Sequence, residues 1–65
     1  QSPLQRVEMT IQETKDPVGR PDEFEITIHM LFFSGSFLIA TAKERDYQKA
    51  VRGAIKRIER QRRET

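Results

Sequence analysis

The chain contains no cysteine and no tryptophan, and it has one histidine among its 65 residues. Without cysteine there is neither an internal disulfide nor a thiolate zinc site, the two staples that often stabilise very small domains. No apolar run approaches the roughly 20 residues of a membrane-spanning helix, and no signal-peptide pattern opens the sequence. We therefore expect a soluble protein of a reducing compartment, either the cytoplasm or an organellar stroma or matrix.

Groups that carry catalysis are equally scarce. His29 has no cysteine or second histidine near it, so we expect an ordinary outward-facing strand residue and not a metal ligand. No serine has an identifiable histidine base, and no glycine-rich phosphate loop occurs. The carboxylates of Glu8, Glu13 and Glu25 are placed on outer strand faces, where acid–base chemistry would lack an enclosing pocket. We predict that the protein is not an enzyme and uses no cofactor.

Length and charge indicate what kind of partner to expect. The chain fits one domain, residues 1–65, and a domain of this size buries only about 60% of its unfolded surface. Because the first residue is Gln1 and not Met, we expect a processed chain or a piece of a longer one. Residues 1–42 hold three basic and six acidic side chains, a net charge of −3, whereas residues 43–65 hold nine basic and four acidic, a net charge of +5. This asymmetry favours a polyanionic partner.

Two segments alternate between apolar and polar residues, the period of a half-buried strand. Segment 4–14 and segment 24–33 are separated by residues 15–23, where two prolines, a glycine and five charges predict a loop. The inward-facing residues are expected to be Val7, Met9 and Ile11 in the first strand, and Phe24, Ile26, Ile28, Met30 and Phe32 in the second.

A glycine turn introduces a third strand. Gly35 lies between two serines and predicts a tight turn into a strand over 36–43, antiparallel to the second. Its sequence leaves two faces open, because either Phe37 and Ile39 or Leu38 and Ala40 would suit the core.

The last segment changes to the 3.6-residue period of a helix, over about 46–63. Asp46 is the expected N-cap, and Thr41 with Glu44 has the spacing of a competing capping box. At about 100° per residue one side of the helix is apolar and should pack on the sheet. This side comprises Tyr47, Ala50, Val51, Ala54, Ile55 and Ile58. The predicted fold class is α+β, a three-stranded antiparallel sheet with one C-terminal helix packed on it.

Five cations share a sector of about 80° on the opposite side of this helix. We call them the basic stripe: Lys49, Arg52, Lys56, Arg60 and Arg63. The planar guanidinium of arginine suits phosphate oxygens, and one helical turn of about 5.4 Å approximates the spacing of phosphates along a strand. A merely solvated face is the alternative. A membrane surface is disfavoured, because the apolar side of the helix is needed by the sheet.

Two further helix residues lie off the basic stripe. Arg57 flanks the core, where it would contact either the partner or the sheet edge. Gly53 is expected beside the stripe, either to admit a phosphate backbone or another helix or as a tolerated exposed glycine.

Several residues of the second half of the chain have the types and the spacings that are found in a known protein family. They are Gly35, Leu38, Ala40, Ala42, Asp46, Tyr47, Ala50, Val51, Gly53, Ile55, Arg57, Arg60 and Gln61. In this pattern the chain resembles the closing part of the ribosome hibernation-promoting factors, also called ribosome-associated inhibitor or factor Y proteins. Arg57 and Arg60 match basic positions of the family, whereas Arg52 and Lys56 stand where its members often carry aspartate.

The resemblance implies a fold and a function. The family domain is β-α-β-β-β-α, similar to double-stranded-RNA-binding domains, and this chain lacks its first strand and first helix. Family members bind the small ribosomal subunit in the channel used by mRNA and tRNA, and so silence translation during stress. Without the first helix, part of the sheet would be open and would expose Val7, Met9, Phe24 or Ile26. We therefore expect self-association through this face or a place within a longer protein.

The function that we predict is binding of small-subunit ribosomal RNA by a basic helix face. The RNA-binding residues would be Lys49, Arg52, Lys56, Arg57, Arg60 and Arg63. The alternative is a protein-interaction or dimerisation module that uses the open sheet face and the 31–37 hairpin. Phenylalanines of that hairpin would serve as core or protein contacts, or as a base-stacking platform.

Overall fold

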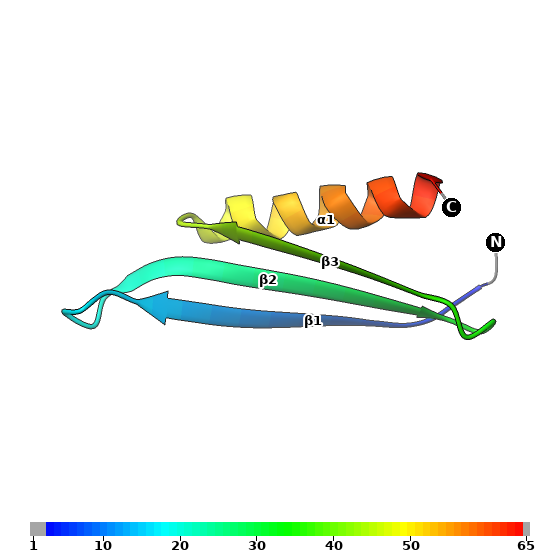
Figure 1. Cartoon of the computed structure of the whole chain (residues 1–65), viewed down its shortest axis with the longest axis horizontal. Helices are drawn as coiled ribbons and strands as arrows, with labels where there is room; N and C mark the ends of the chain where they lie inside the picture. Colours follow the sequence, from blue (N-terminus) through cyan, green and yellow to red (C-terminus); the bar gives the residue numbers. More distant parts are fainter. Residues whose placement is uncertain (1–2, 65) are drawn as a thin grey trace.

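The computed structural model describes residues 3–64 as one antiparallel sheet covered by one helix (Figure 1). The elements are β1 (Leu4–Lys15), β2 (Pro21–Phe32), β3 (Phe37–Glu44) and α1 (Tyr47–Glu64). The strands lie in the order β1-β2-β3, and α1 follows them along one face of the sheet. The predicted α+β class is confirmed.

The strand register decides which residues face the helix. Met9 lies opposite Ile28, which lies opposite Ala40 on β3. Side chains in register share a face of the sheet, so the expected inward positions of β1 and β2 are confirmed. The ambiguity in β3 is also resolved, since Ala40 and Ala42 are buried under the helix while Phe37 and Ile39 are exposed on the other face.

Small side chains bring α1 close to β3. The buried core consists of Ile26, Ile28, Phe32, Ala40, Ala42, Ala50, Ala54 and Ile58. A Cβ added at Gly53 would lie 3.3 Å from the Cβ of Ala42, tighter than ordinary van der Waals contact. Gly53 therefore lies at the contact between helix and sheet, at the border of the basic stripe, and the expectation of an exposed glycine open to a partner is wrong. The physical reason for a glycine at this position is packing, because a side chain here would push α1 away from β3.

The turns and the helix start follow the local sequence. The backbone N–H of Lys49 donates to Oδ1 of Asp46 at 3.0 Å, so Asp46 is the N-cap. The competing start is excluded, because Thr41 and Glu44 belong to β3. Gly35 has a φ of 94° in the β2–β3 turn, a conformation that favours glycine.

The loop between β1 and β2 is shorter than predicted. It spans residues 16–20, because β1 runs to Lys15 and β2 begins at Pro21, both within the expected loop. Oδ1 of Asp16 accepts hydrogen bonds from the backbone N–H groups of Val18 and Arg20, which fixes the turn locally. The side chain of Arg20 lies 3.7 Å from the carboxylate of Asp16, so its contact is within the loop. This hairpin projects beyond the start of α1 (Figure 1).

The helix covers only part of the sheet. It packs on β3 and β2 and leaves β1 exposed along its whole length. Val7, Met9 and Ile11 are 48%, 50% and 47% exposed, as expected for an open half of the face. The expectation is wrong for Ile26, which is 0% exposed because α1 lies over it. Phe24 is half-buried, its ring 5.6 Å from that of Tyr47 in an edge contact.

Candidate nucleic-acid interface

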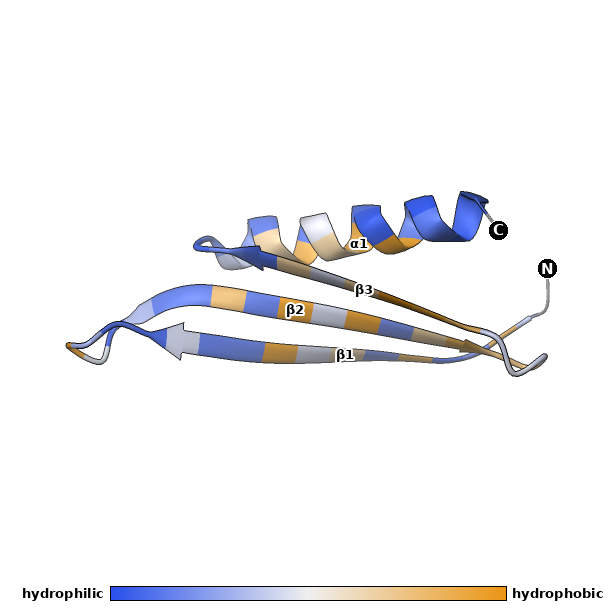
Figure 2. Ribbon diagram, in the orientation of Figure 1, coloured by the Kyte–Doolittle hydropathy of each residue, from blue (hydrophilic) through white to orange (hydrophobic). Residues whose placement is uncertain are grey.

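The burial of one helix side fixes the direction of the other. Ala50, Ala54 and Ile58 are buried against the sheet, so the opposite side of α1 points to solvent. All five residues of the basic stripe are exposed. Figure 2 shows the same division, with hydrophobic residues on the sheet side of α1 and hydrophilic residues dominating its last turns. The structure therefore brings the five predicted cations together on one outward surface.

Intramolecular ion pairs leave the basic stripe uncompensated. The ion pairs found among residues 3–64 join Arg6 to Glu8, Arg20 to Asp16 and Lys43 to Glu25, at 2.9, 3.7 and 3.3 Å respectively. Each of these basic residues lies outside α1. The stripe thus presents about one cation per helical turn over a length of about 21 Å. A row of like charges at this spacing raises the local potential and attracts a polyanion.

Arg57 occupies a different place from the other predicted cations. Its Nη1 donates a hydrogen bond to the backbone carbonyl of Thr41, on the outer edge of β3. Nε2 of Gln61 donates to the carbonyl of Ile39 at 2.9 Å, one turn further along the helix. Of the two contacts that the sequence left open for Arg57, the structure therefore describes the one with the sheet edge. The guanidinium remains exposed and borders the stripe.

One arginine of the last helical turn was not among the predicted residues. The guanidinium carbon of Arg62 lies 5.9 Å from the centre of the Phe32 ring, within the range of a cation–π contact. Arg62 is thus directed toward the side of α1 that borders the open half of the sheet. In a helical projection Arg62 lies about 60° from Tyr47, which is on the apolar side of the helix. This small angle was the sign in the sequence that Arg62 points toward the sheet and not toward the stripe.

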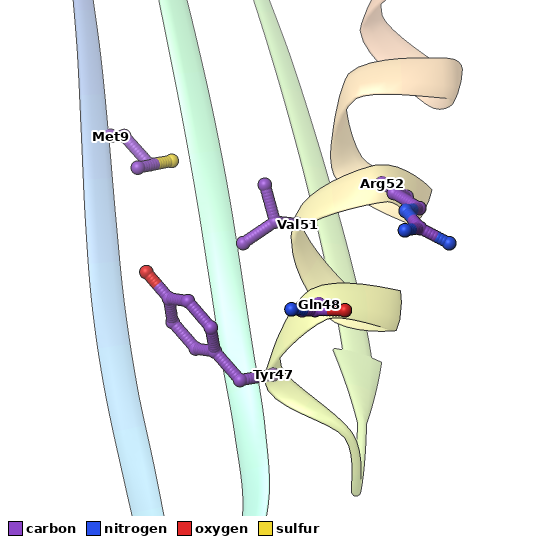
Figure 3. Close-up of a pocket in the computed structure, with 5 residues that line it drawn as sticks. All are labelled: Met9, Tyr47, Gln48, Val51 and Arg52. Atoms are coloured by element: carbon purple, nitrogen blue, oxygen red, sulfur yellow. The ribbon is translucent and has the colours of Figure 1, made fainter.

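A shallow depression of about 240 Å³ separates α1 from β1. Met9, Tyr47 and Val51 point toward one another across it, and Arg52 points away from the sheet (Figure 3). Gln48 completes its lining. The depression is apolar at its floor and has one stripe residue, Arg52, at its rim. The open sheet face and the basic stripe, which the sequence suggested as separate surfaces, therefore adjoin at Arg52.

The phenylalanines of the second hairpin do not share one face. Phe32 is buried in the core, whereas Phe33 and Phe37 are 67% and 59% exposed. Phe37 lies on the face away from α1, where its ring meets that of His29 edge-on at 5.6 Å. His29 is therefore outward-facing, as predicted. A base-stacking platform would require coplanar access that these three rings do not offer together.

The remaining candidate groups are dispersed. Glu13 lies opposite Phe24 and shares the helix side of the sheet, so its placement on the outer face with Glu8 and Glu25 is wrong. Over residues 3–64 no three His, Cys, Asp or Glu side chains gather in a way that could hold a metal ion. Within the same range no helix is long and apolar enough to cross a membrane. No family model, curated protein or solved structure matches the chain at a significant level.

Proposed function

We propose that this domain binds structured RNA through the basic stripe and that its target is small-subunit ribosomal RNA. In this role it acts as a ribosome-associated inhibitor of translation during stress or hibernation, in the cytoplasm or in an organelle that carries ribosomes. The resemblance of residues 35–61 to the hibernation-promoting factors favours this target, and the stripe supplies the chemistry.

The observation that carries the proposal is a row of five exposed cations outside every ion pair described for residues 3–64. Solubility alone requires charge of either sign on a helix surface, not one sign along one line. The opposite side of α1 is packed on the sheet, so the stripe is held in a fixed orientation. A rigid row of donors binds phosphates with less loss of conformational freedom than a mobile tail.

The individual residues contribute unequally. Arg52, Lys56 and Arg60 lie in the middle of the stripe and would make the central phosphate contacts. Lys49 and Arg63 would extend the contact at its two ends. Arg57 would contribute from the margin, because its side chain already donates to the β3 edge. Arg60 matches a basic position of the family pattern, whereas Arg52 and Lys56 depart from it, so the contacts of these two residues are not implied by the resemblance.

Recognition of this kind reads the backbone and shape of RNA more than its bases. Lys and Arg side chains contact phosphates, and the wide, shallow minor groove of A-form RNA displays 2′-hydroxyls to an approaching helix. Release of counterions from the RNA makes the affinity fall steeply with salt. The domain would therefore need a shaped RNA surface, such as that of a ribosomal subunit, for its specificity.

A second candidate function is a protein-interaction module, and the open half of the sheet favours it. Val7, Met9 and Ile11 present apolar side chains beside the depression under α1. Phe33 is exposed at the neighbouring hairpin. Contiguous apolar residues on a small domain often mark a contact with another protein.

Co-sedimentation with purified small ribosomal subunits across a salt series tests the first proposal. The decisive variant combines Arg52→Glu, Lys56→Glu and Arg60→Glu. Its matched control combines Arg6→Glu, Lys15→Glu and Arg20→Glu, which changes the net charge equally but on the β1–β2 hairpin. We expect salt-sensitive binding that the stripe variant abolishes and the control retains.

The opposite results are equally clear. Equal loss in both variants would mean that net charge and not the stripe drives binding. Absence of binding at low salt would leave the protein-interaction function, which Phe33→Ser should impair without any effect on RNA.

A further inference from the structure

We propose that two copies of this chain associate through β1, in antiparallel pairing, to form one continuous six-stranded sheet. The inference concerns the free edge of the sheet and does not rest on the RNA-binding function. Four observations carry it: the direction of the free backbone groups, the protected opposite edge, the register of the apolar residues and the distribution of charge.

The backbone groups of the apolar positions of β1 point away from β2. The N–H of Phe33 donates to the carbonyl of Pro3, beside β1, whereas the N–H of Phe32 donates to the carbonyl of Ser36, beside β3. Hydrogen-bonding direction alternates along an antiparallel strand. Odd residues of β2 therefore bond to β1, and their partners there are even residues such as Glu8, opposite His29, and Thr10, opposite Thr27. The N–H and carbonyl groups of Val7, Met9 and Ile11 consequently face the free edge.

The other edge of the sheet is already occupied. Arg57 and Gln61 donate side-chain hydrogen bonds to the edge carbonyls of Thr41 and Ile39 on β3. A further strand would have to displace both. Each copy thus offers one open edge, and pairing through it yields a closed two-fold dimer and not a growing fibre.

One register suits the side chains of β1. Symmetric antiparallel pairing requires a two-fold axis perpendicular to the sheet, so the helix side of one copy continues as the helix side of the other. With Met9 opposite Met9 of the second copy, Val7 lies opposite Ile11, and every inward pair in the middle is apolar. A shift of two residues one way places Val7 opposite Glu13, and a shift the other way places Glu8 opposite Glu8.

The irregularities of β1 limit the pairing to its middle. The pairing of β1 with β2 shifts register between Leu4 and Arg6, where β1 has an extra residue, and between Thr14 and Lys15, where β2 has one. Bulges of this kind disturb the ladder locally. The regular part between them contains the three apolar residues, and antiparallel pairing there exchanges about six hydrogen bonds, two for each of three opposed pairs.

Charge favours the antiparallel arrangement. Residues 13–25, around the projecting hairpin, hold five acidic and two basic side chains, a net charge of −3. Residues 56–63, at the other end of the molecule, hold five basic and one acidic side chain, a net charge of +4. Antiparallel pairing of β1 places the acidic end of each copy beside the basic end of the other, which is electrostatic complementarity.

Stacking of two sheets face to face is the less suitable geometry. The basic stripe lies on the outer side of α1, and α1 stands over β2 and β3 on the same face of the sheet as the open half. A second sheet laid over the whole of this face would meet α1 and its cations before it reached β1, and would remove the cations from water at high cost. Edge pairing leaves both stripes exposed and on the same face.

Cysteine cross-linking tests the dimer and its register together, and it is clean because the chain has no cysteine of its own. Met9→Cys lies on the two-fold axis, where the expected Cα separation of about 5.5 Å permits a disulfide. We expect mild oxidation to link Met9→Cys to itself. Val7→Cys and Ile11→Cys should link poorly alone, but an equal mixture of the two should give the mixed dimer.

Sedimentation across a wide concentration range supplies the second measurement. The mass should rise from 7.7 kDa toward twice that value. Met9→Pro removes one edge-facing N–H, which an edge strand tolerates, and should weaken dimerisation by about tenfold or more through the hydrogen bonds lost at the axis. A circular dichroism melt of this variant verifies that the monomer folds.

Two results would overturn the inference. One is a monomeric mass at every concentration. The other is cross-linking that is equal for all three single cysteines, which indicates random collision. The two proposals can fail independently. Loss of RNA binding with dimerisation retained in the stripe variant, or loss of dimerisation with RNA binding retained in Met9→Pro, would show that the two properties are separate.

Discussion

At the scale of single residues, Asp46 illustrates how one side chain sets the start of an element. Its Oδ1 accepts the backbone N–H of Lys49, and its own carbonyl accepts the N–H of Ala50. The carboxylate thus satisfies one of the free donors of the first helical turn and opposes the positive end of the helix dipole. The first turn of α1 itself contains no acidic residue, so this task falls on the cap.

We expect Asp46→Ala to lower the free energy of unfolding by about 1 kcal/mol, because an N-cap acceptor is lost. Urea denaturation followed by circular dichroism measures the change. Asp46→Asn is the matched control, since it keeps an oxygen acceptor and should lose only a few tenths of this amount. A loss in Asp46→Asn equal to that in Asp46→Ala would assign the effect to charge and not to the hydrogen bond.

Gly53 shows what a one-dimensional pattern cannot supply. A helical projection placed it at the border of the stripe, which was consistent with solvent exposure. Its true surroundings depend on how far α1 is displaced sideways over the sheet, toward β3 and away from β1. The small buried residues Ala42, Ala50 and Ala54 allow the backbones of α1 and β3 to approach closely at this place.

At the scale of elements, α1 both covers a face and closes an edge. Its buried side packs on β2 and β3, and two longer side chains at its flank reach the free carbonyls of β3. Edge strands are the usual sites of unwanted pairing, and natural proteins protect them with charge or cover. In this molecule the helix protects β3, while the pairing of β1 with β2 is irregular only at its ends.

The double variant Arg57→Ala and Gln61→Ala should therefore change two properties. The free energy of unfolding should fall by about 1 to 2 kcal/mol, as two hydrogen bonds are lost. Because the second edge is then open, assemblies larger than a dimer should appear in sedimentation. Arg60→Ala with Arg63→Ala is the control, since both remove exposed cations from the same helix without freeing the edge. Identical behaviour of the two double variants would contradict a protective role.

The strands themselves were largely predictable, and the reason is their alternation. In β2 the apolar residues occupy alternate positions, so the sequence alone indicates which face of the strand is buried. In β3 both faces carry apolar side chains, with Phe37 and Ile39 on one and Leu38 and Ala40 on the other, and periodicity alone had no basis for a choice. The pairing with β2 decides it, because Ala40 lies opposite Ile28 and shares its buried face.

At the scale of the whole molecule, the basic stripe was predictable but its neighbours were not. Helical geometry alone groups five cations on one side. The place of a sixth cation, Arg57, depends on how near α1 lies to the edge of the sheet. Its side chain reaches that edge and donates a hydrogen bond to the carbonyl of Thr41. The half-covered sheet was also expected in outline, but its boundary was not, since the position of the helix determines that Ile26 is buried and Met9 is open.

The proposed RNA contact makes a quantitative prediction. If Arg52, Lys56 and Arg60 each neutralise a phosphate, replacement of all three by alanine should reduce the slope of log affinity against log salt by about 2 to 3. Binding titrations of the wild-type chain and this variant at several salt concentrations measure the two slopes. An unchanged slope with a lower affinity would mean that the three residues act without contacting phosphate.

The position of β1 has a consequence for how the molecule moves. This strand is bonded to β2 alone and is exposed over its whole length, whereas β2, β3 and α1 share the buried core. Regions with few buried contacts open at lower free energy than the global unfolding of the domain. We expect β1 to separate and return as one cooperative unit while the other three elements remain folded. The same strand that is most available to a second copy is then also the first to leave its own sheet.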